Sequence, residues 1–185
     1  MTNNMEWPRR PRLVPDRALP PYAYVAGQHP HPIRDPRGHS FGIKPDDPEP
    51  PDPQRWQACG PYLYGIDLFN HGYYWEAHES WEELWRACGR SGPAGIFLKA
   101  LIGLAAAGFK VRVANLQGVR RHAQRAARLF HETAMAIGPH GPSYMGLDLR
   151  ALERWASDVA ECPPINGDYG SRRETVVFDF VLRPV

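Results

Sequence analysis

The sequence has few cysteines and little net charge, and both shortages exclude classes of protein. Three cysteines stand among 185 residues, at Cys59, Cys88 and Cys162, and no two of them have C-x-x-C spacing. A small, odd number without that spacing argues against a disulfide framework, so we expect a reduced, cytoplasmic protein. The formal net charge of +2 gives no general attraction to nucleic acid or to an anionic membrane.

Long apolar runs are missing as well. The first fifteen residues lack the apolar core of a signal peptide. The longest strongly apolar run free of charge, between Lys99 and Lys110, is too short to span a bilayer. Hydrophobic residues make up 43% of the chain and charged residues 23%, which is ordinary for a soluble globular protein. We therefore expect one soluble unit without a membrane segment.

Proline, by contrast, is abundant and unevenly placed, because 14 of the 20 prolines fall within residues 1–61. Proline lacks the N–H that a helix needs and restricts the residue before it, so long helices are excluded there. We expect an irregular proline-rich N-terminal arm over residues 1–53. Its aromatic side chains Tyr22, Tyr24 and Phe41 are expected to be buried and to dock the arm on the body.

Helical spacing begins at about residue 54 and continues to residue 162. Turns rich in glycine and proline divide this region, and Asn115 has the chemistry of a helix N-cap. The pattern predicts helices over residues 54–70, 73–88, 94–113, 116–137 and 148–160. Short turns join the first four into pairs, so we expect a mainly α fold: a helical bundle of about five helices, two helix hairpins plus one.

The last segment, residues 163–185, has a different pattern. In ETVVFDFVL, alternate residues from Val176 to Leu182 are apolar, which indicates a short C-terminal strand. A lone strand leaves its edges unpaired. We expect its partner to be YAYV, residues 22–25 of the arm.

The stretch HESWEELWRACG, from His78, carries the most chemistry in the chain. On a helix, His78 and Glu82 lie one turn apart and can meet. On a helical wheel, the pair lies at the edge of an apolar face that is centred on Trp81, and the indole of Trp85 lies beside the pair. Lys99 interrupts the next, otherwise apolar helix, and we expect Glu79 or Glu82 to be its counter-charge.

Two consecutive stretches, LFNHGYYWEAHESWEELWR and FLKALIGLAAAGFKVRVANLQGV, resemble the domain of unknown function 309 family of small helical bacterial proteins. The resemblance runs from about Tyr62 to Phe130, and Lys99 stands where the family pattern suggests glutamine. The matched positions are Gly72, Glu76, Ala77, His78, Glu79, Glu82, Trp85 and Asn115. The resemblance implies an all-α bundle in a bacterial protein and says little about activity.

The favoured interpretation of this polar site is a binding or scaffold role without chemistry. Polar groups at a helix crossing often form a satisfied network, and an unknown small molecule or protein partner could use it. The candidate binding residues are Glu76, His78, Glu79, Glu82, Trp85, Arg86 and Lys99. The arginines of residues 116–137 are expected to form a solvated basic face, which makes nucleic acid an unfavoured partner. The sequence leaves open whether the protein forms a homodimer.

The alternative is a small acid–base or metal-dependent hydrolase that uses His78, Glu79 and Glu82 as catalytic candidates. HESWE resembles H-E-x-x-H with a glutamate in the second histidine's place, and His71 or Asp67 would have to complete the metal ligands. Because the set of His71, His78 and Glu82 is incomplete, we expect no metal and no cofactor. The arm histidines His29, His31 and His39 could join His71 at a metal, but a docked loop is the expectation.

Overall fold

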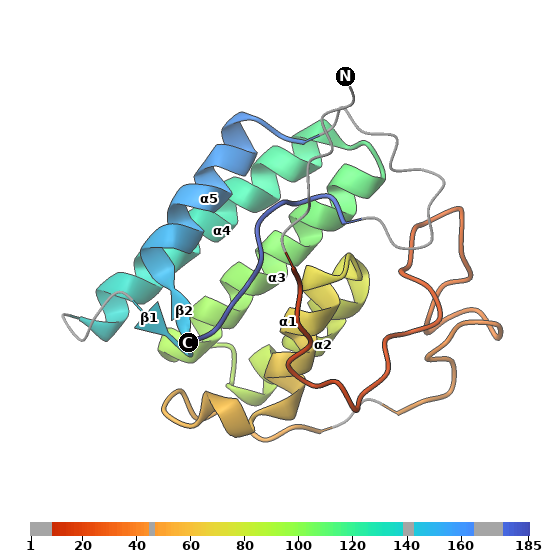
Figure 1. Cartoon of the computed structure of the whole chain (residues 1–185), viewed down its shortest axis with the longest axis horizontal. Coiled ribbons are helices and arrows are strands. Elements are labelled where there is room, and N and C mark those ends of the chain that lie inside the picture. Colours follow the sequence, from red (N-terminus) through yellow and green to blue (C-terminus); the bar gives the residue numbers. More distant parts are fainter. Residues whose placement is uncertain (1–8, 45–46, 139–142, 165–175) are drawn as a thin grey trace.

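The computed structural model describes residues 9–44, 47–138, 143–164 and 176–185. The mainly α prediction is confirmed, since the described residues form a bundle of five α-helices with one small hairpin (Figure 1). The helices are α1 (Gly60–Asn70), α2 (Tyr74–Ala87), α3 (Gly92–Arg112), α4 (Leu116–Ile137) and α5 (Leu149–Glu161). Between α4 and α5, β1 (Ser143–Tyr144) pairs antiparallel with β2 (Leu147–Asp148).

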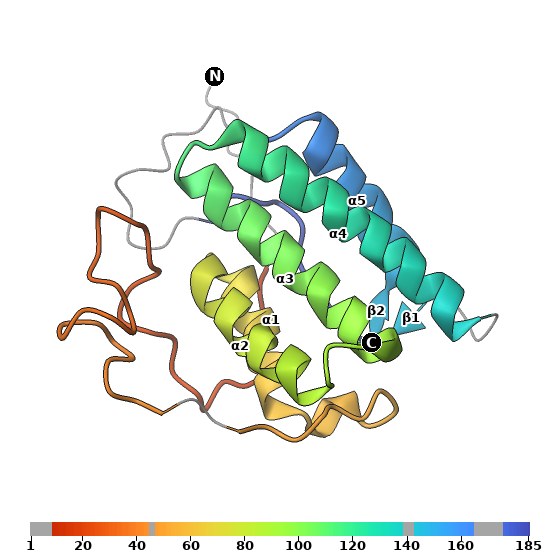
Figure 2. The same ribbon diagram turned by 180° about the vertical axis from the view of Figure 1, so that it is seen from behind.

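Helix α3 is the centre of the bundle. It packs between α2 and α4, while α1 packs on α2 and α5 packs on α4 (Figures 1 and 2). Small residues allow this close packing: a Cβ atom on Gly108 would lie 2.6 Å from the ring of Tyr74 in α2. By length and composition α3 could cross a membrane, but 67% of its most apolar window is buried inside the protein. It is therefore positioned as a core helix.

The helix boundaries follow local chemistry. Asn115 caps α4 as predicted, because its side chain accepts a hydrogen bond from the N–H of Gly118 at 2.7 Å. The first helix begins later than predicted, at Gly60, where Pro61 occupies its first turn. Residues Trp56–Ala58 form a separate 3₁₀ turn instead. Trp81 is fully buried as predicted, and its indole N–H donates to the carbonyl of Tyr62 in α1.

The N-terminal arm docks on the body through a buried carboxylate. Asp67 of α1, which is 0% exposed, accepts hydrogen bonds from the Nε–H of Arg12 and the backbone N–H groups of Leu13 and Val14. The predicted aromatic anchors are only partly right. Tyr22 and Tyr24 are half-buried, whereas Phe41 is 49% exposed.

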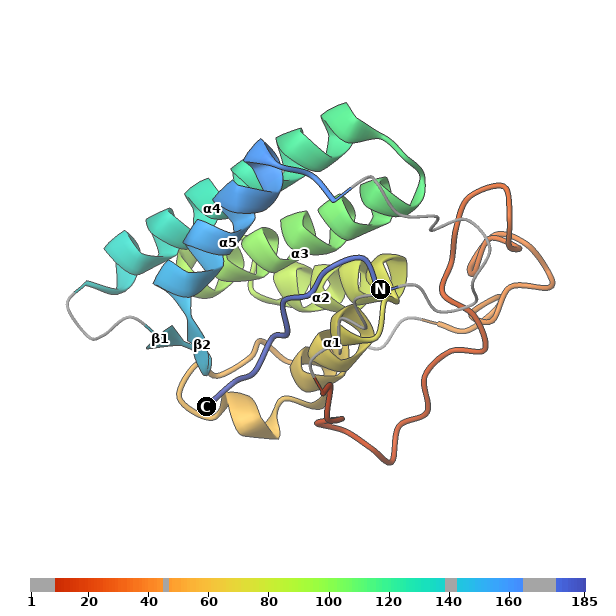
Figure 3. The same cartoon turned by 45° about the horizontal axis from the view of Figure 1, so that its top comes forward.

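The predicted C-terminal strand is wrong for the part of it that the structure describes, since residues 176–182 have no strand partner; residues 174–175 lie outside the described residues. Side chains replace the partner strand. The amide of Asn70 donates to the carbonyl of Leu182 and accepts from its N–H, both at 2.9 Å. The Tyr74 hydroxyl accepts from the N–H of Val177. Figure 3 shows this dark blue segment running past α1 toward the hairpin.

The proposed partner, residues 22–25, lies elsewhere. The N–H of Tyr24 donates to the Glu76 carboxylate of α2 at 2.9 Å, and Ala23 and Val25 are buried. The apolar alternation of the C-terminal segment also predicted the wrong burial pattern, because the adjacent residues Val177 and Phe178 are both buried. The segment is a docked extended chain, not an edge of a sheet.

Candidate functional site

Helix α2 supplies most of the predicted site because its apolar side faces inward and leaves two polar sides. Tyr74, Ala77, Trp81 and Leu84 are buried. His78 and Glu82 lie on one polar side, and Glu76 lies on another, toward the arm. One helix therefore carries two different groups of charged residues.

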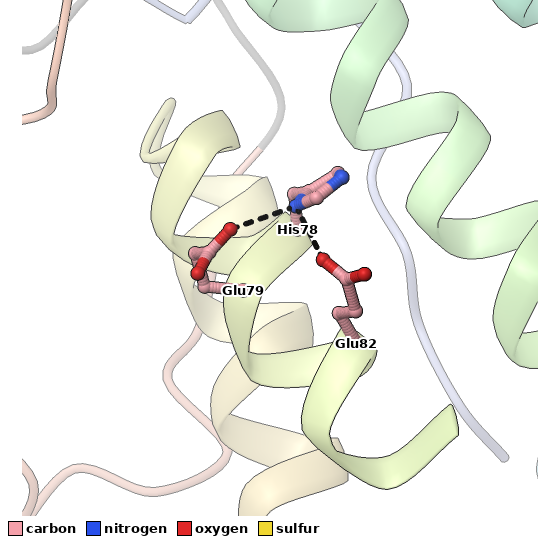
Figure 4. A group of neighbouring side chains, drawn as sticks. All are labelled: His78, Glu79 and Glu82. Carbon is pink, nitrogen blue, oxygen red and sulfur yellow. Dashed lines mark hydrogen bonds and ion pairs between the residues drawn. The ribbon is translucent and has the colours of Figure 1, made fainter. Parts of the chain in front are cut away.

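The first group is formed by His78, Glu79 and Glu82 (Figure 4). The Nδ1 atom of His78 lies 3.2 Å from Oε1 of Glu79 and 3.7 Å from Oε2 of Glu82. The three side chains are 31%, 31% and 24% exposed. Two carboxylates beside Nδ1 favour a proton on that nitrogen, which orients the ring as in catalytic and metal-binding histidines. Figure 4 shows Nε2 pointing away from both carboxylates.

The neighbours of this group are cationic. Arg86, one turn after Glu82, places a guanidinium nitrogen 3.4 Å from the Oε1 atom of Glu82. The ammonium of Lys99 in α3 lies 3.8 Å from the centroid of the Trp85 ring, a cation–π contact. Glu82 acts on Lys99 as a counter-charge, as predicted, but only at a distance, since no ion pair joins Lys99 to a carboxylate within the described part of the chain. Burial lowers the pKa of Lys99, and attraction to Glu82 opposes that shift only in part.

Helix α4 extends this cationic surrounding. Burial lowers the pKa of His122, and the charges of Arg121, Lys110, His78 and Arg125 lower it further. His78 and His122 therefore lie within electrostatic range of each other. Three helices thus contribute charge to one side of the bundle, where Figure 2 shows α2, α3 and α4 side by side.

The predicted third metal ligand does not join the group. The Nδ1 atom of His71 donates to the backbone carbonyl of Asp67 at 2.8 Å, and the Asp67 carboxylate binds the arm. Glu79 takes the third place instead, with ligand atoms of the three residues all within 4.8 Å of one another. One imidazole and two carboxylates could hold a divalent transition metal, although Arg86 beside Glu82 opposes a cation there.

Glu76, also a predicted site residue, belongs to the second group. It is 6% exposed, and its Oε1 atom accepts from the N–H of Tyr24 and lies 3.2 Å from Nε2 of His39. Sequence reasoning missed this pair because His39 comes from the irregular arm, 37 residues away. No helical or strand spacing connects the two positions.

The other arm histidines form an aromatic layer, which supports the expectation of a docked loop. His29 stacks on Tyr22 with ring centroids 5.0 Å apart. His31 packs edge-on against Trp75 of α2 at 5.4 Å and also contacts Tyr24. These rings cover the arm side of α2.

The chain was compared with known families and proteins. Residues 62–122 match the model of the family described as Domain of unknown function (DUF309). No curated protein matches the chain. The match runs from α1 into α4 and includes the His78 group, while the arm, α5 and the C-terminal segment lie outside it.

Proposed function

We propose that the protein binds a small anion beside His78, within the stretch of residues 62–122 that matches the model of the DUF309 family. The observation that supports this proposal is that positively charged side chains from three helices lie near the oriented imidazole of His78. Arg86 comes from α2, Lys99 and Lys110 from α3, and His122 with its arginine neighbours from α4.

The electrostatics favour an anionic ligand. Lys99 and His122 both have lowered pKa values, and each is affected by neighbouring positive groups as well as by burial. An anion placed among them relieves that repulsion, because an opposite charge favours the protonated form of each group. His78 adds a directed polar group: Nδ1 faces the carboxylates, so Nε2 is the ring nitrogen left to face a ligand.

Covalent catalysis has less support than binding. The nearest hydroxyl on the helix, Ser80, donates to the backbone carbonyl of Pro61 at 3.1 Å. Burial raises the pKa of Cys88, which makes its thiol a poorer nucleophile. The site thus offers an imidazole and cations without an activated nucleophile on the same helix.

Phosphate titration by calorimetry tests the proposal directly. We expect saturable binding that weakens with added salt, since the contacts are ionic. Lys99→Met should weaken it about 5-fold to 30-fold, the range for losing one or two partly exposed ionic contacts. Arg120→Gln is the matched control, because Arg120 is an exposed α4 cation outside the His122 neighbourhood. Equal losses in both variants, or no binding at all, would contradict the proposal.

A metal-dependent or acid–base hydrolase is the second candidate, favoured by the His78 ring held between two carboxylates. In that case, His78, Glu79 and Glu82 would hold a divalent ion or activate water. Elemental analysis after purification without chelators distinguishes the two. A stoichiometric transition metal that His78→Ala abolishes favours the hydrolase, and a metal-free protein that binds phosphate favours the anion site.

A further inference from the structure

A pocket of about 260 Å³ lies between the N-terminal arm and the arm-facing side of α2. Its α2 wall carries Glu76, Glu79 and Glu83, which stand one or two turns apart and so follow one side of the helix. Tyr64 and Trp75 add aromatic surface. The pocket thus combines a row of carboxylates with aromatic rings, and it shares one residue, Glu79, with the His78 group.

Glu76 is the deepest of these carboxylates. Its side chain is 5% exposed, Oε1 is engaged by Tyr24 and His39, and Oε2 has no hydrogen-bond partner in the described structure. Arg112 and His29 lie within electrostatic range of it. A buried carboxylate oxygen without a hydrogen bond is costly, so Glu76 keeps an unmet acceptor and a negative charge at the base of the pocket.

The arm already places a cation in this pocket. Arg17, which lines it, holds its guanidinium carbon 3.9 Å from the centroid of the Tyr64 ring. Cation–π contact of this kind is how aromatic sites bind guanidinium and ammonium groups. Lys44 also lines the arm side, so positive charge lies opposite the carboxylates of α2.

We propose that this pocket binds a small organic cation, an alkylguanidinium or alkylammonium. Its charged end lies against the glutamates of α2 and its apolar part against Ile33 and Leu68. The volume is below the range of about 300–1,000 Å³ typical of drug-sized ligands, which restricts the ligand to a molecule smaller than a typical drug. A metal ion fits less well. The histidine at this wall, His39, is already paired with the Glu76 carboxylate, and together they supply one nitrogen and one carboxylate, fewer ligands than a metal site needs.

Arg17 makes the proposal sharply testable, because the ligand and this guanidinium compete for the face of Tyr64. Removing Arg17 vacates that face and also removes a like charge. Its backbone carbonyl, which accepts a hydrogen bond from Arg12, is unaffected by a change of side chain. Arg17→Ala should therefore increase affinity for the ligand. Arg34→Ala is the matched control, since Arg34 is an exposed arm cation that does not line the pocket.

The experiment is calorimetric titration of the full chain with n-butylguanidinium, n-butylammonium and n-butylurea, the last a neutral isostere. We expect both cations to bind and the urea not to bind. Glu83→Gln should weaken cation binding about 3-fold to 10-fold, and Arg17→Ala should strengthen it about 3-fold or more, as expected for single partly exposed charges. Glu76→Gln should abolish binding while its arm contacts are retained through the amide oxygen.

Three results overturn the proposal: butylurea binding as well as butylguanidinium, no cation binding in the Arg17→Ala protein, or equal changes in Arg17→Ala and Arg34→Ala. If Glu76→Gln fails to fold, Glu83→Gln and Arg17→Ala still decide the question. Phosphate binding beside Lys99 is measured separately, so either site can fail without the other.

Discussion

His78 and His122 lie within electrostatic range of each other but in opposite surroundings. His78 has Glu79 and Glu82 against its Nδ1 atom. His122 is partly buried and has Arg121, Lys110 and Arg125 as its charged neighbours, and its pKa is lowered. The same residue type thus lies against carboxylates in α2 and among cations in α4, and only the α4 histidine has a lowered pKa.

The lowered pKa of His122 predicts a pH dependence with a definite sign. The folded chain binds this proton less readily than the unfolded chain, so the free energy of unfolding decreases as pH falls through the ordinary value of 6.5. The decrease ends below the lowered folded pKa. Urea unfolding between about pH 7.5 and about pH 5 measures it.

His122→Gln should flatten this decrease, and the exposed His131→Gln is the control. His29 has a pKa shift of the same direction, caused first by burial, so some slope remains in the His122 variant. Added phosphate should also flatten the slope in the unmodified protein, since a bound anion favours protonated His122. A His122→Gln protein with an unchanged slope would show that the histidine does not contribute.

The absence of a direct Glu82–Lys99 contact changes what a double-mutant cycle should measure. A shared buried hydrogen bond would couple the two residues by about 1–3 kcal/mol. With Lys99 on the Trp85 ring and Arg86 beside Glu82, we expect a coupling of about 0.2–1 kcal/mol, the range of exposed pairs. Urea unfolding of Glu82→Gln, Lys99→Met and the double variant gives the value; a coupling above about 2 kcal/mol would restore the direct pair.

At the level of elements, local signals predicted the helices and failed for the C-terminal segment. The helices depend on interactions between residues close in sequence, such as the Asn115 cap, and these are visible in the sequence. The C-terminal segment depends on Asn70 and Tyr74, more than a hundred residues away. Apolar alternation indicates an extended chain, but it does not specify whether a strand or side chains will satisfy the backbone.

Asn70 makes two of the hydrogen bonds that hold that segment, both to Leu182, which makes it a sensitive test. Asn70→Ala leaves both the N–H and the carbonyl of Leu182 buried without these partners. We expect a loss of about 2–4 kcal/mol in the free energy of unfolding and faster hydrogen exchange at the Leu182 amide. Gln124→Ala, an exposed α4 change, is the control. A loss below about 0.5 kcal/mol would mean that the segment is held mainly by its apolar side chains.

Across the whole molecule, the arm was predictable as a docked segment but its contacts were not. Composition excluded helices there, and the aromatics indicated docking. The residues that receive the arm, Asp67 and Glu76, look like ordinary helix carboxylates in the sequence. Only the folded chain shows that arm groups surround them, with His39 on Glu76 and Arg12 on Asp67. The pocket on α2 could not be predicted for the same reason, since one of its walls is irregular chain.

Asp67 predicts how much the bundle depends on the arm. In the full chain its buried carboxylate has Arg12 and two backbone donors, so Asp67→Asn should destabilise the protein. In a chain without residues 1–53 those donors are gone, and the carboxylate that they cover is open to water. The same substitution should then change the free energy of unfolding of the truncated chain by less than about 0.5 kcal/mol, as is usual for a solvated position. Urea unfolding of the four proteins tests this difference; a substitution that destabilises both chains equally would show that the arm does not compensate Asp67.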